Sequence, residues 1–209
     1  MNASDSAIQS AAQALIAAGA LFHRRGWVPA TGGNFSARLN QEQLLITASG
    51  CHKGELREED FLIADLAGRP LDTARKSSYE TGLHTQLYAW GDQQGAAIGS
   101  VLHTHSTANT VLSRRFERIE LRGYELQKIL PGAPDPQTPV SIPVFENDQD
   151  IARLVARVHA HMLECSQNIA YLIAGHGLYA WGGSVAEARY RVEAIEFMLD
   201  CHLTELLLK

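Results

Sequence analysis

The chain has 209 residues, the length of one ordinary domain or at most two small ones. Hydrophobic residues make up 45% of it and charged residues 20%, which excludes a disordered, collagenous or coiled-coil protein. The formal net charge is −5 and no basic run occurs, so we expect neither nucleic acid nor a membrane surface as a partner.

The sequence carries no targeting or membrane signal. No apolar stretch approaches the roughly 20 residues that span a bilayer, and residues 1–10 lack the pattern of a secretory signal, so we expect a cytoplasmic protein. The three cysteines, Cys51, Cys165 and Cys201, are odd in number and none forms a CxxC pair. We therefore expect neither a disulfide framework nor a cysteine zinc site. Any metal would have to be bound by the nine histidines or by carboxylates.

The first part of the chain combines one helix with short strands. Apolar residues recur at helical spacing after Ser4 and Asp5, either of which can cap the helix. Alternating apolar residues separated by glycine-rich or polar turns then predict strands. The expected elements are a helix to residue 26, strands at 35–39, 44–47 and 61–66, and polar loops at 30–34 and 48–54.

From residue 79 onward, helical and strand patterns alternate. Asn147 is expected to cap one helix, and Ser184 with Glu187 forms a capping box at the start of the last. The expected helices are at 79–90, 106–114, 124–130, 147–162 and 184–209, and the expected strands are at 97–102, 140–145, 169–174 and 178–181. No repeat or linker divides the chain, so a single α/β domain over 1–209, with a mixed sheet between helical layers, is the simplest solution.

The strongest local signal is His103-Thr104-His105, where a predicted strand ends. Residues two apart on an extended strand point to the same side, so both imidazoles can reach one ion. The same spacing occurs at His159-Ala160-His161, but inside a predicted helix, where residues two apart diverge by about 200°. We therefore expect the second pair to be partly exposed and not to chelate.

A site that binds zinc and keeps a position open for substrate needs a third ligand. His176 is the best candidate because it lies in a tight turn between Gly175 and Gly177, where the backbone can approach a site closely. The alternative is a turn histidine that is hydrogen-bonded to backbone. The remaining histidines have no comparable context, and that alternative holds more strongly for them: His23, His52, His84 and His202.

Three segments are rich in glycine, serine and asparagine and could bind phosphate. They are Thr31–Asn34, Ala48–Gly50 and Lys76–Glu80, the last just before a predicted helix. Such loops offer backbone N–H groups and hydroxyls, and a helix N-terminus adds a favourable dipole. Each segment alone is equally typical of a turn or an N-cap.

Five ordered segments together resemble the class II aldolase family of the fuculose-phosphate aldolase and ribulose-phosphate epimerase type. They are TGGNFS at 31–36, ITASG at 46–50, KSSYETGLH at 76–84, HTHS at 103–106 and AGHG at 174–177. The resemblance implies a three-layer α/β/α fold with a central mixed sheet, and a phosphorylated ketose as substrate. It also implies one zinc ion per subunit, and a homotetramer with active sites between neighbouring subunits.

The resemblance assigns residues one by one. His103, His105 and His176 match the zinc histidines. The positions that contact the substrate phosphate are Asn34, Ser49, Gly50 and Ser78. Glu80 stands where the aldolases keep their acid/base glutamate. Tyr79 departs from the pattern, because aldolases usually have a second serine there.

Within the family, three segments are most similar to the branch that dehydrates a methylthio-substituted ketose phosphate in methionine salvage. They are 48–54, 124–128 and 175–182. In that branch Glu125 matches the acid/base glutamate, and the C-terminal extension with a catalytic tyrosine that aldolases tend to carry has no counterpart. The alternatives are a sugar-phosphate aldolase or epimerase with the same zinc site, and a non-catalytic binding protein on the same fold. Without the resemblance, Glu125 would be interpreted as a solvated helix carboxylate.

Overall fold

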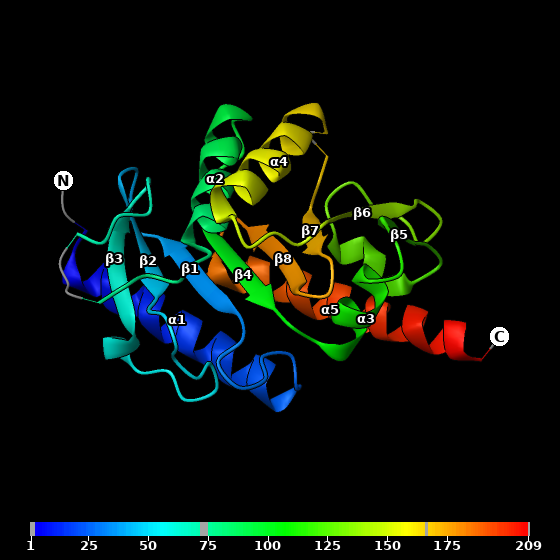
Figure 1. Cartoon of the computed structure of the whole chain (residues 1–209), viewed down its shortest axis with the longest axis horizontal. Helices are drawn as coiled ribbons and strands as arrows, with labels where there is room; N and C mark the ends of the chain where they lie inside the picture. Colours follow the sequence, from blue (N-terminus) through cyan, green and yellow to red (C-terminus); the bar gives the residue numbers. More distant parts are fainter. Residues whose placement is uncertain (1–2, 72–74, 166, 209) are drawn as a thin grey trace.

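The structure is a computed structural model that describes residues 3–71, 75–165 and 167–208. Within these residues, one mixed sheet lies between two layers of helices (Figure 1). The helices are α1 (Asp5–Arg24), α2 (Thr81–Gln93), α3 (Thr107–Ser113), α4 (Ile151–Glu164) and α5 (Val185–Leu207), with 3₁₀ turns η1 (Glu58–Asp60) and η2 (Glu125–Ile129). The strands are β1 (Asn34–Arg38), β2 (Gln43–Thr47), β3 (Phe61–Asp65), β4 (Ser100–Thr104), β5 (Arg118–Leu121), β6 (Val140–Phe145), β7 (Ala170–Ile173) and β8 (Gly177–Gly182).

The strand order of the sheet is β3-β2-β1-β4-β8-β7-β6-β5. All neighbours are antiparallel except β6 and β7, which are parallel. In the register, His103 of β4 lies opposite Asn34 of β1 on one side and opposite Tyr179 of β8 on the other. The start of β1, the end of β4 and the start of β8 therefore meet at one edge of the sheet.

Each face of the sheet has its own apolar core. On one face, α1, α3 and α5 bury residues such as Leu15, Leu112 and Val192. On the other, α2 and α4 bury residues such as Leu83 and Leu154 (Figure 1). This arrangement confirms the predicted three-layer α/β/α fold.

Two of the predicted helix N-caps are confirmed and one is wrong. Ser4 caps α1 by accepting a hydrogen bond from the N–H of Ala7 at 3.3 Å, and Ser184 accepts one from Glu187 at 3.2 Å. The prediction that Asn147 caps the next helix is wrong. Asp150 caps α4 instead, because its carboxylate accepts the N–H of Arg153 at 3.1 Å.

The strand prediction missed β5 and ended β4 two residues too early. In β5, buried Ile119 and Leu121 alternate with exposed Arg118 and Glu120, but four residues are too few for a period of two to be recognised. β5 forms because it pairs along the edge of β6. The β4 ladder continues through Thr104, so His103 lies inside a strand, paired on both sides.

Among the described helices, none is long and apolar enough to cross a bilayer. Cys51, Cys165 and Cys201 are free thiols.

Candidate metal and substrate site

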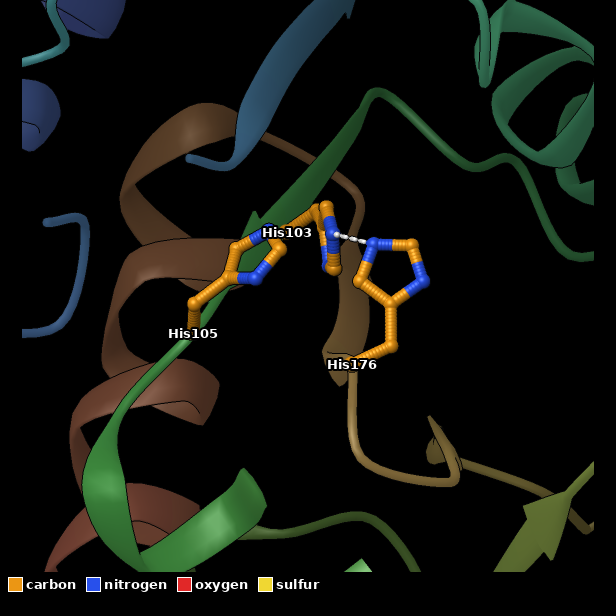
Figure 2. A group of neighbouring side chains, drawn as sticks. All are labelled: His103, His105 and His176. Carbon is orange, nitrogen blue, oxygen red and sulfur yellow. Dashed lines mark hydrogen bonds between the residues drawn. The ribbon is translucent and has the colours of Figure 1, made fainter. Parts of the chain in front are cut away.

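Three histidines from two distant parts of the chain converge at the sheet edge where β4 ends (Figure 2). His103 lies in β4, His105 directly follows it, and His176 lies in the turn between β7 and β8. Each ring offers one nitrogen, and these nitrogens all lie within 4.8 Å of one another. The Nε2 atoms of His103 and His176 are 3.4 Å apart.

The orientation of the His103 ring is fixed by its surroundings. Its Nδ1 atom lies 2.9 Å from the carbonyl oxygen of Leu178 and donates to it. The ring also stacks on Tyr179, with centroids 3.9 Å apart and planes 11° apart. Because Nδ1 carries the proton, Nε2 has the free lone pair, as in most histidines that bind metals, and it faces Nε2 of His176.

Burial keeps these rings in the form that can bind a metal. His103 is fully buried, and burial lowers its pKa well below the ordinary value. Burial also lowers the pKa of His105, to about 4. Both imidazoles are therefore neutral near pH 7, with lone pairs free to coordinate.

The donor set fits a divalent ion such as zinc. Zinc–nitrogen bonds of about 2.0–2.1 Å in a tetrahedral site place two ligand nitrogens about 3.4 Å apart. The Nε2 atoms of His103 and His176 already have this separation. Three protein ligands would leave a fourth position for substrate, as catalytic zinc sites require.

Two glycines allow the neighbouring strands to approach β4. A Cβ atom on Gly177 would lie 2.1 Å from the carbonyl oxygen of Thr104 and 2.8 Å from Cε1 of His103. A Cβ atom on Gly33 would lie 2.5 Å from the carbonyl oxygen of His103, and Gly33 also has a φ of +78°. Any larger residue at either position would displace β4, which carries His103, from its neighbours.

Glu80 places a carboxylate directly beside the histidines. It precedes α2, with Oε1 2.7 Å from Nε2 of His176 and Oε2 3.6 Å from Nε2 of His103. The amide of Asn34 donates to Oε2 at 2.5 Å. Burial acts to raise the pKa of Glu80, but the nearby histidines and these hydrogen bonds outweigh it and hold the pKa well below the usual range. The carboxylate is therefore ionised at neutral pH.

A buried chain of hydrogen bonds holds the side chain of Asn34 in place. Nε2 of His84 donates to Oδ1 of Asn34, and Nδ1 of His84 lies 2.7 Å from Oγ of Ser36. The hydroxyl of Tyr88 lies 2.7 Å from the same Oγ. His84 is therefore a hydrogen-bonded histidine, as expected, but its partners are the side chains of Asn34 and Ser36 and not the backbone. Its position four residues after Glu80, on the same face of a helix, is the sequence signal that indicates this neighbourhood.

The structure brings the three predicted phosphate segments together. Oγ of Ser78 accepts from Nδ2 of Asn34 at 3.1 Å, and the N–H of Ser49 donates to the carbonyl oxygen of Lys76 at 3.1 Å. Gly50 follows with a φ of +80°, exposed like Ser49.

Buried Lys53 joins the segment at Thr31–Asn34 to the loop that follows Ala48–Gly50. Its ammonium group donates to the carbonyl oxygens of Thr31 at 2.9 Å and of Cys51 at 2.6 Å. The lysine thereby holds the glycine-rich turn against the following loop.

The site opens to solvent through a cleft of about 290 Å³, and its lining residues come from four segments: Tyr79, Glu80, His105, Asn147, Asp148, Gln149, Ile151, Gly175 and His176. Across its mouth, the hydroxyl of Tyr79 donates to the carbonyl oxygen of Gln149 at 2.7 Å. A larger groove of about 930 Å³ lies elsewhere, beside Trp90, Arg118 and Trp181. None of the predicted site residues lines that groove, so we assign the chemistry to the smaller cleft.

Glu125 does not join this cluster within one chain. It lies on η2 with 74% of its side chain exposed and forms an ion pair with Lys128. In the described part of the chain, it makes no hydrogen bond or ion pair to the three histidines or to Glu80. Its predicted role therefore requires a contact that one copy of the chain does not provide.

The second His-x-His pair lies on a helix, as predicted. His159 and His161 are half-buried on α4, and the ring of His161 packs edge-on against Phe145 with centroids 5.3 Å apart. Among the described residues, only the three histidines at the sheet edge form a cluster that could hold a metal ion.

Comparison with known proteins identifies the family. Residues 13–203 match the family described as Class II Aldolase and Adducin N-terminal domain. The chain belongs to this family.

The matches to similar proteins cover most of the chain. A protein named methylthioribulose-1-phosphate dehydratase from Pseudomonas aeruginosa (strain LESB58) is 50% identical over 193 residues, which cover 91% of this chain and 92% of that protein. A protein of the same name from Serratia proteamaculans is 47% identical over 199 residues, covering 94% and 96%. The crystal structure of L-fuculose-1-phosphate aldolase from Thermus thermophilus superposes with a TM-score of 0.77 at 24% identity, covering 96% and 97%. That structure shows the shared fold.

Proposed function

We propose that this chain is a zinc-dependent dehydratase. It would convert 5-methylthioribulose 1-phosphate to 2,3-diketo-5-methylthiopentyl 1-phosphate and water, a step of methionine salvage. The observation that carries the proposal is 50% identity, over 91% of the chain, to a protein named methylthioribulose-1-phosphate dehydratase. The gathered histidines and the carboxylate of Glu80 provide groups that this chemistry needs.

His103, His105 and His176 would hold one zinc ion per subunit. A divalent ion bound there would act as a Lewis acid on substrate oxygens, with its full charge undiminished by carboxylate ligands. The protein contributes the fixed ring orientations and a largely buried setting, in which electrostatic stabilisation is stronger than in water.

The phosphate group would bind at the other end of the site, on Asn34, Ser49, Gly50 and Ser78. The hydroxyls of Ser49 and Ser78 and the backbone N–H of Gly50 lie next to the start of α2, whose dipole favours an anion, and Asn34 is hydrogen-bonded to Ser78. Binding the phosphate away from the reacting carbons positions C3 and C4 of the substrate beside Glu80.

Dehydration with ketonisation requires three proton transfers. A base takes the proton from C3, next to the C2 carbonyl, and the C–H electron pair moves into the C2–C3 unit. The C3–C4 double bond then forms as the C4 hydroxyl leaves with a proton from an acid, and the resulting enol becomes the diketone when C4 is protonated. Glu80 and Glu125 are the two groups that we assign to this acid/base work.

Glu80 belongs to the site of its own chain, whereas Glu125 would be supplied by a neighbouring subunit. Glu125 is exposed on η2, next to the exposed apolar side chains of Leu126 and Ile129, 39% and 52% exposed. Apolar surface of this kind is suited to a subunit contact. A homotetramer with sites between subunits would place Glu125 of one copy at the histidines of the next.

The alternatives share the same site. A sugar-phosphate aldolase or epimerase would use the same histidines, but the aldolase structure at 24% identity supports the fold alone. A non-catalytic protein with a structural zinc would be expected to have four protein ligands, whereas the described residues gather three histidines.

The direct test is to incubate the purified protein, with its metal content measured, with 5-methylthioribulose 1-phosphate and separately with L-fuculose 1-phosphate. We expect the diketone phosphate from the first substrate and no cleavage of the second. Cleavage of fuculose 1-phosphate to a triose phosphate would support the aldolase alternative. Turnover of neither substrate by metal-loaded protein would contradict an enzyme of either kind.

A further inference from the structure

A buried carboxylate lies behind the metal-binding segment, on the opposite face of β4. Glu196 of α5 is fully buried. Its Oε1 atom accepts hydrogen bonds from Oγ1 of Thr104 at 2.5 Å and from Nδ2 of Asn109 at 2.9 Å. Its Oε2 atom accepts one from Oγ of Ser106 at 2.5 Å. Three donors from the β4–α3 connection therefore converge on one side chain of the last helix.

The residues bound by Glu196 stand on both sides of His105. Thr104 precedes it and Ser106 follows it, and each donates to a different oxygen of the carboxylate. The register of β4 with β8 ends at Thr104, opposite Leu178, so strand pairing no longer fixes the position of His105. Its backbone N–H donates to the carbonyl oxygen of Trp27 at 2.7 Å.

The directions of the side chains follow from strand geometry. His103 points toward the α2 and α4 face, so Thr104 points toward the α5 face and meets Glu196. Other bonds fix which way the hydroxyl protons point. Oγ of Ser106 accepts the N–H of Asn109 at 3.0 Å, so its own proton is free for Glu196. Oγ1 of Thr104 accepts from Nδ2 of Asn109 at 3.4 Å and likewise donates to the carboxylate.

A carboxylate is an unusual choice at this position of α5. Its buried neighbours along the helix are apolar, among them Val192, Ile195 and Leu199. Burying a charge disfavours folding unless hydrogen bonds compensate, and a well-packed apolar side chain would often give equal stability. Packing alone therefore does not explain a carboxylate that accepts hydrogen bonds from three side chains of the β4–α3 connection.

We propose that Glu196 is a positioning residue that holds His105 at metal-binding distance from His103 and His176. It fixes the backbone on both sides of His105, while the imidazole itself faces the site. The inference rests on the proposed metal site. It concerns the pre-organisation of the ligands, which contributes to affinity before any substrate binds.

The experiment measures the zinc affinity of the metal-free protein by competition with a chromogenic chelator. We expect Glu196→Gln and Thr104→Val to weaken zinc binding by about 10-fold, the lower end of the range for residues that orient metal ligands. Thr104→Val keeps the shape of the side chain and removes the hydroxyl. Thr104→Ser keeps the hydroxyl and should bind zinc like the wild type.

The control for general destabilisation is Ile195→Ala, which removes a buried apolar side chain next to Glu196 and leaves the hydrogen bonds of Glu196 to the connection in place. At temperatures where all variants are folded, it should lower the melting temperature but leave zinc affinity unchanged. Equal zinc affinities of wild type, Glu196→Gln and Thr104→Val would overturn the inference, as would an equal loss in Ile195→Ala. Failure of the wild type to bind zinc would instead contradict the proposed metal site.

Discussion

Oε1 of Glu80 lies 2.7 Å from Nε2 of His176, which itself lies 3.4 Å from Nε2 of His103. Asn34 holds the other carboxylate oxygen at 2.5 Å, so Glu80 is directed at the site from a fixed position. A substrate bound at the histidines would have its reacting carbons within reach of this carboxylate.

Replacing Glu80 by glutamine removes its ability to move a proton while keeping its shape. We expect kcat for 5-methylthioribulose 1-phosphate to fall by about 10²–10⁴-fold, with zinc still bound. Kinetics and metal analysis on the same preparation test this. Glu164→Gln, at an exposed position of α4, is the control and should retain normal turnover. A kcat of Glu80→Gln close to the control value would remove Glu80 from proton transfer.

Replacing Glu125 by glutamine tests whether this second carboxylate takes part in proton transfer and whether a neighbouring subunit supplies it. We expect Glu125→Gln to lower kcat by about 10²–10⁴-fold and to leave zinc bound. Activity should return in part when Glu125→Gln subunits are dissociated and reassembled with His103→Ala subunits, since a mixed oligomer contains some sites with intact histidines and an intact Glu125. If mixed oligomers form without regaining activity, Glu125 does not act across a subunit boundary.

The two His-x-His pairs provide a matched test of the metal ligands. His103→Ala should lose zinc and activity together, because a ligand within the triad is removed. His161→Ala, a substitution of the same type on α4, should keep both. Elemental analysis and turnover are measured for each variant. Full zinc occupancy in His103→Ala would contradict the assignment of the ligands.

The proposed phosphate contacts are tested by measuring kcat and KM separately for each variant. Ser78→Ala should mainly raise KM, since it removes binding energy remote from the reacting carbons. Asn34→Ala should raise KM and also lower kcat, because Asn34 holds Glu80. Comparing the two variants separates binding from positioning. An unchanged KM in both would contradict the phosphate site.

Buried His84 predicts a pH dependence of stability. Burial lowers its pKa from 6.5 to about 4, so between these values the unfolded chain binds more protons than the folded one. The contribution of His84 to stability is complete above about pH 6.5 and is lost as the pH falls toward 4. By pH 5 the loss amounts to about 2 kcal/mol.

Urea unfolding of the metal-free protein at about pH 8 and about pH 5 measures this loss. Other groups also titrate in this range: burial raises the pKa of Glu196 to about 7, which acts in the opposite direction. The informative quantity is therefore the difference between wild type and His84→Gln. The variant should lose about 2 kcal/mol less on acidification. Equal losses would show that His84 is not held neutral in the folded protein.

Several features could be predicted from local sequence because local physics determines them. The helix caps at Ser4 and Ser184 are satisfied within three residues. The side on which His103 and His105 point follows from the two-residue period of a strand. The expectation of one domain over 1–209 remains a prediction, as do the roles assigned to the site residues.

Other features depend on partners far along the chain. β5 forms because it pairs with β6. His84 forms hydrogen bonds with Ser36 and Asn34, which lie about 50 positions earlier in the chain. Glu196 looks like one more acidic residue of an amphipathic helix until Thr104 and Ser106 are found beside it. Nothing within a few residues of these positions signals such contacts.

The sequence by itself determined the spacing of apolar residues and the order of the motifs. These indicated the family, the layered α/β arrangement and the candidate ligands. Only the tertiary structure decided that the turn holding His176 meets the end of β4, that Glu80 reaches into the cluster, and that Glu125 stays outside it in a single copy. Periodicity and capping act over a few residues, whereas these distances depend on how strands pair and helices pack across the whole chain.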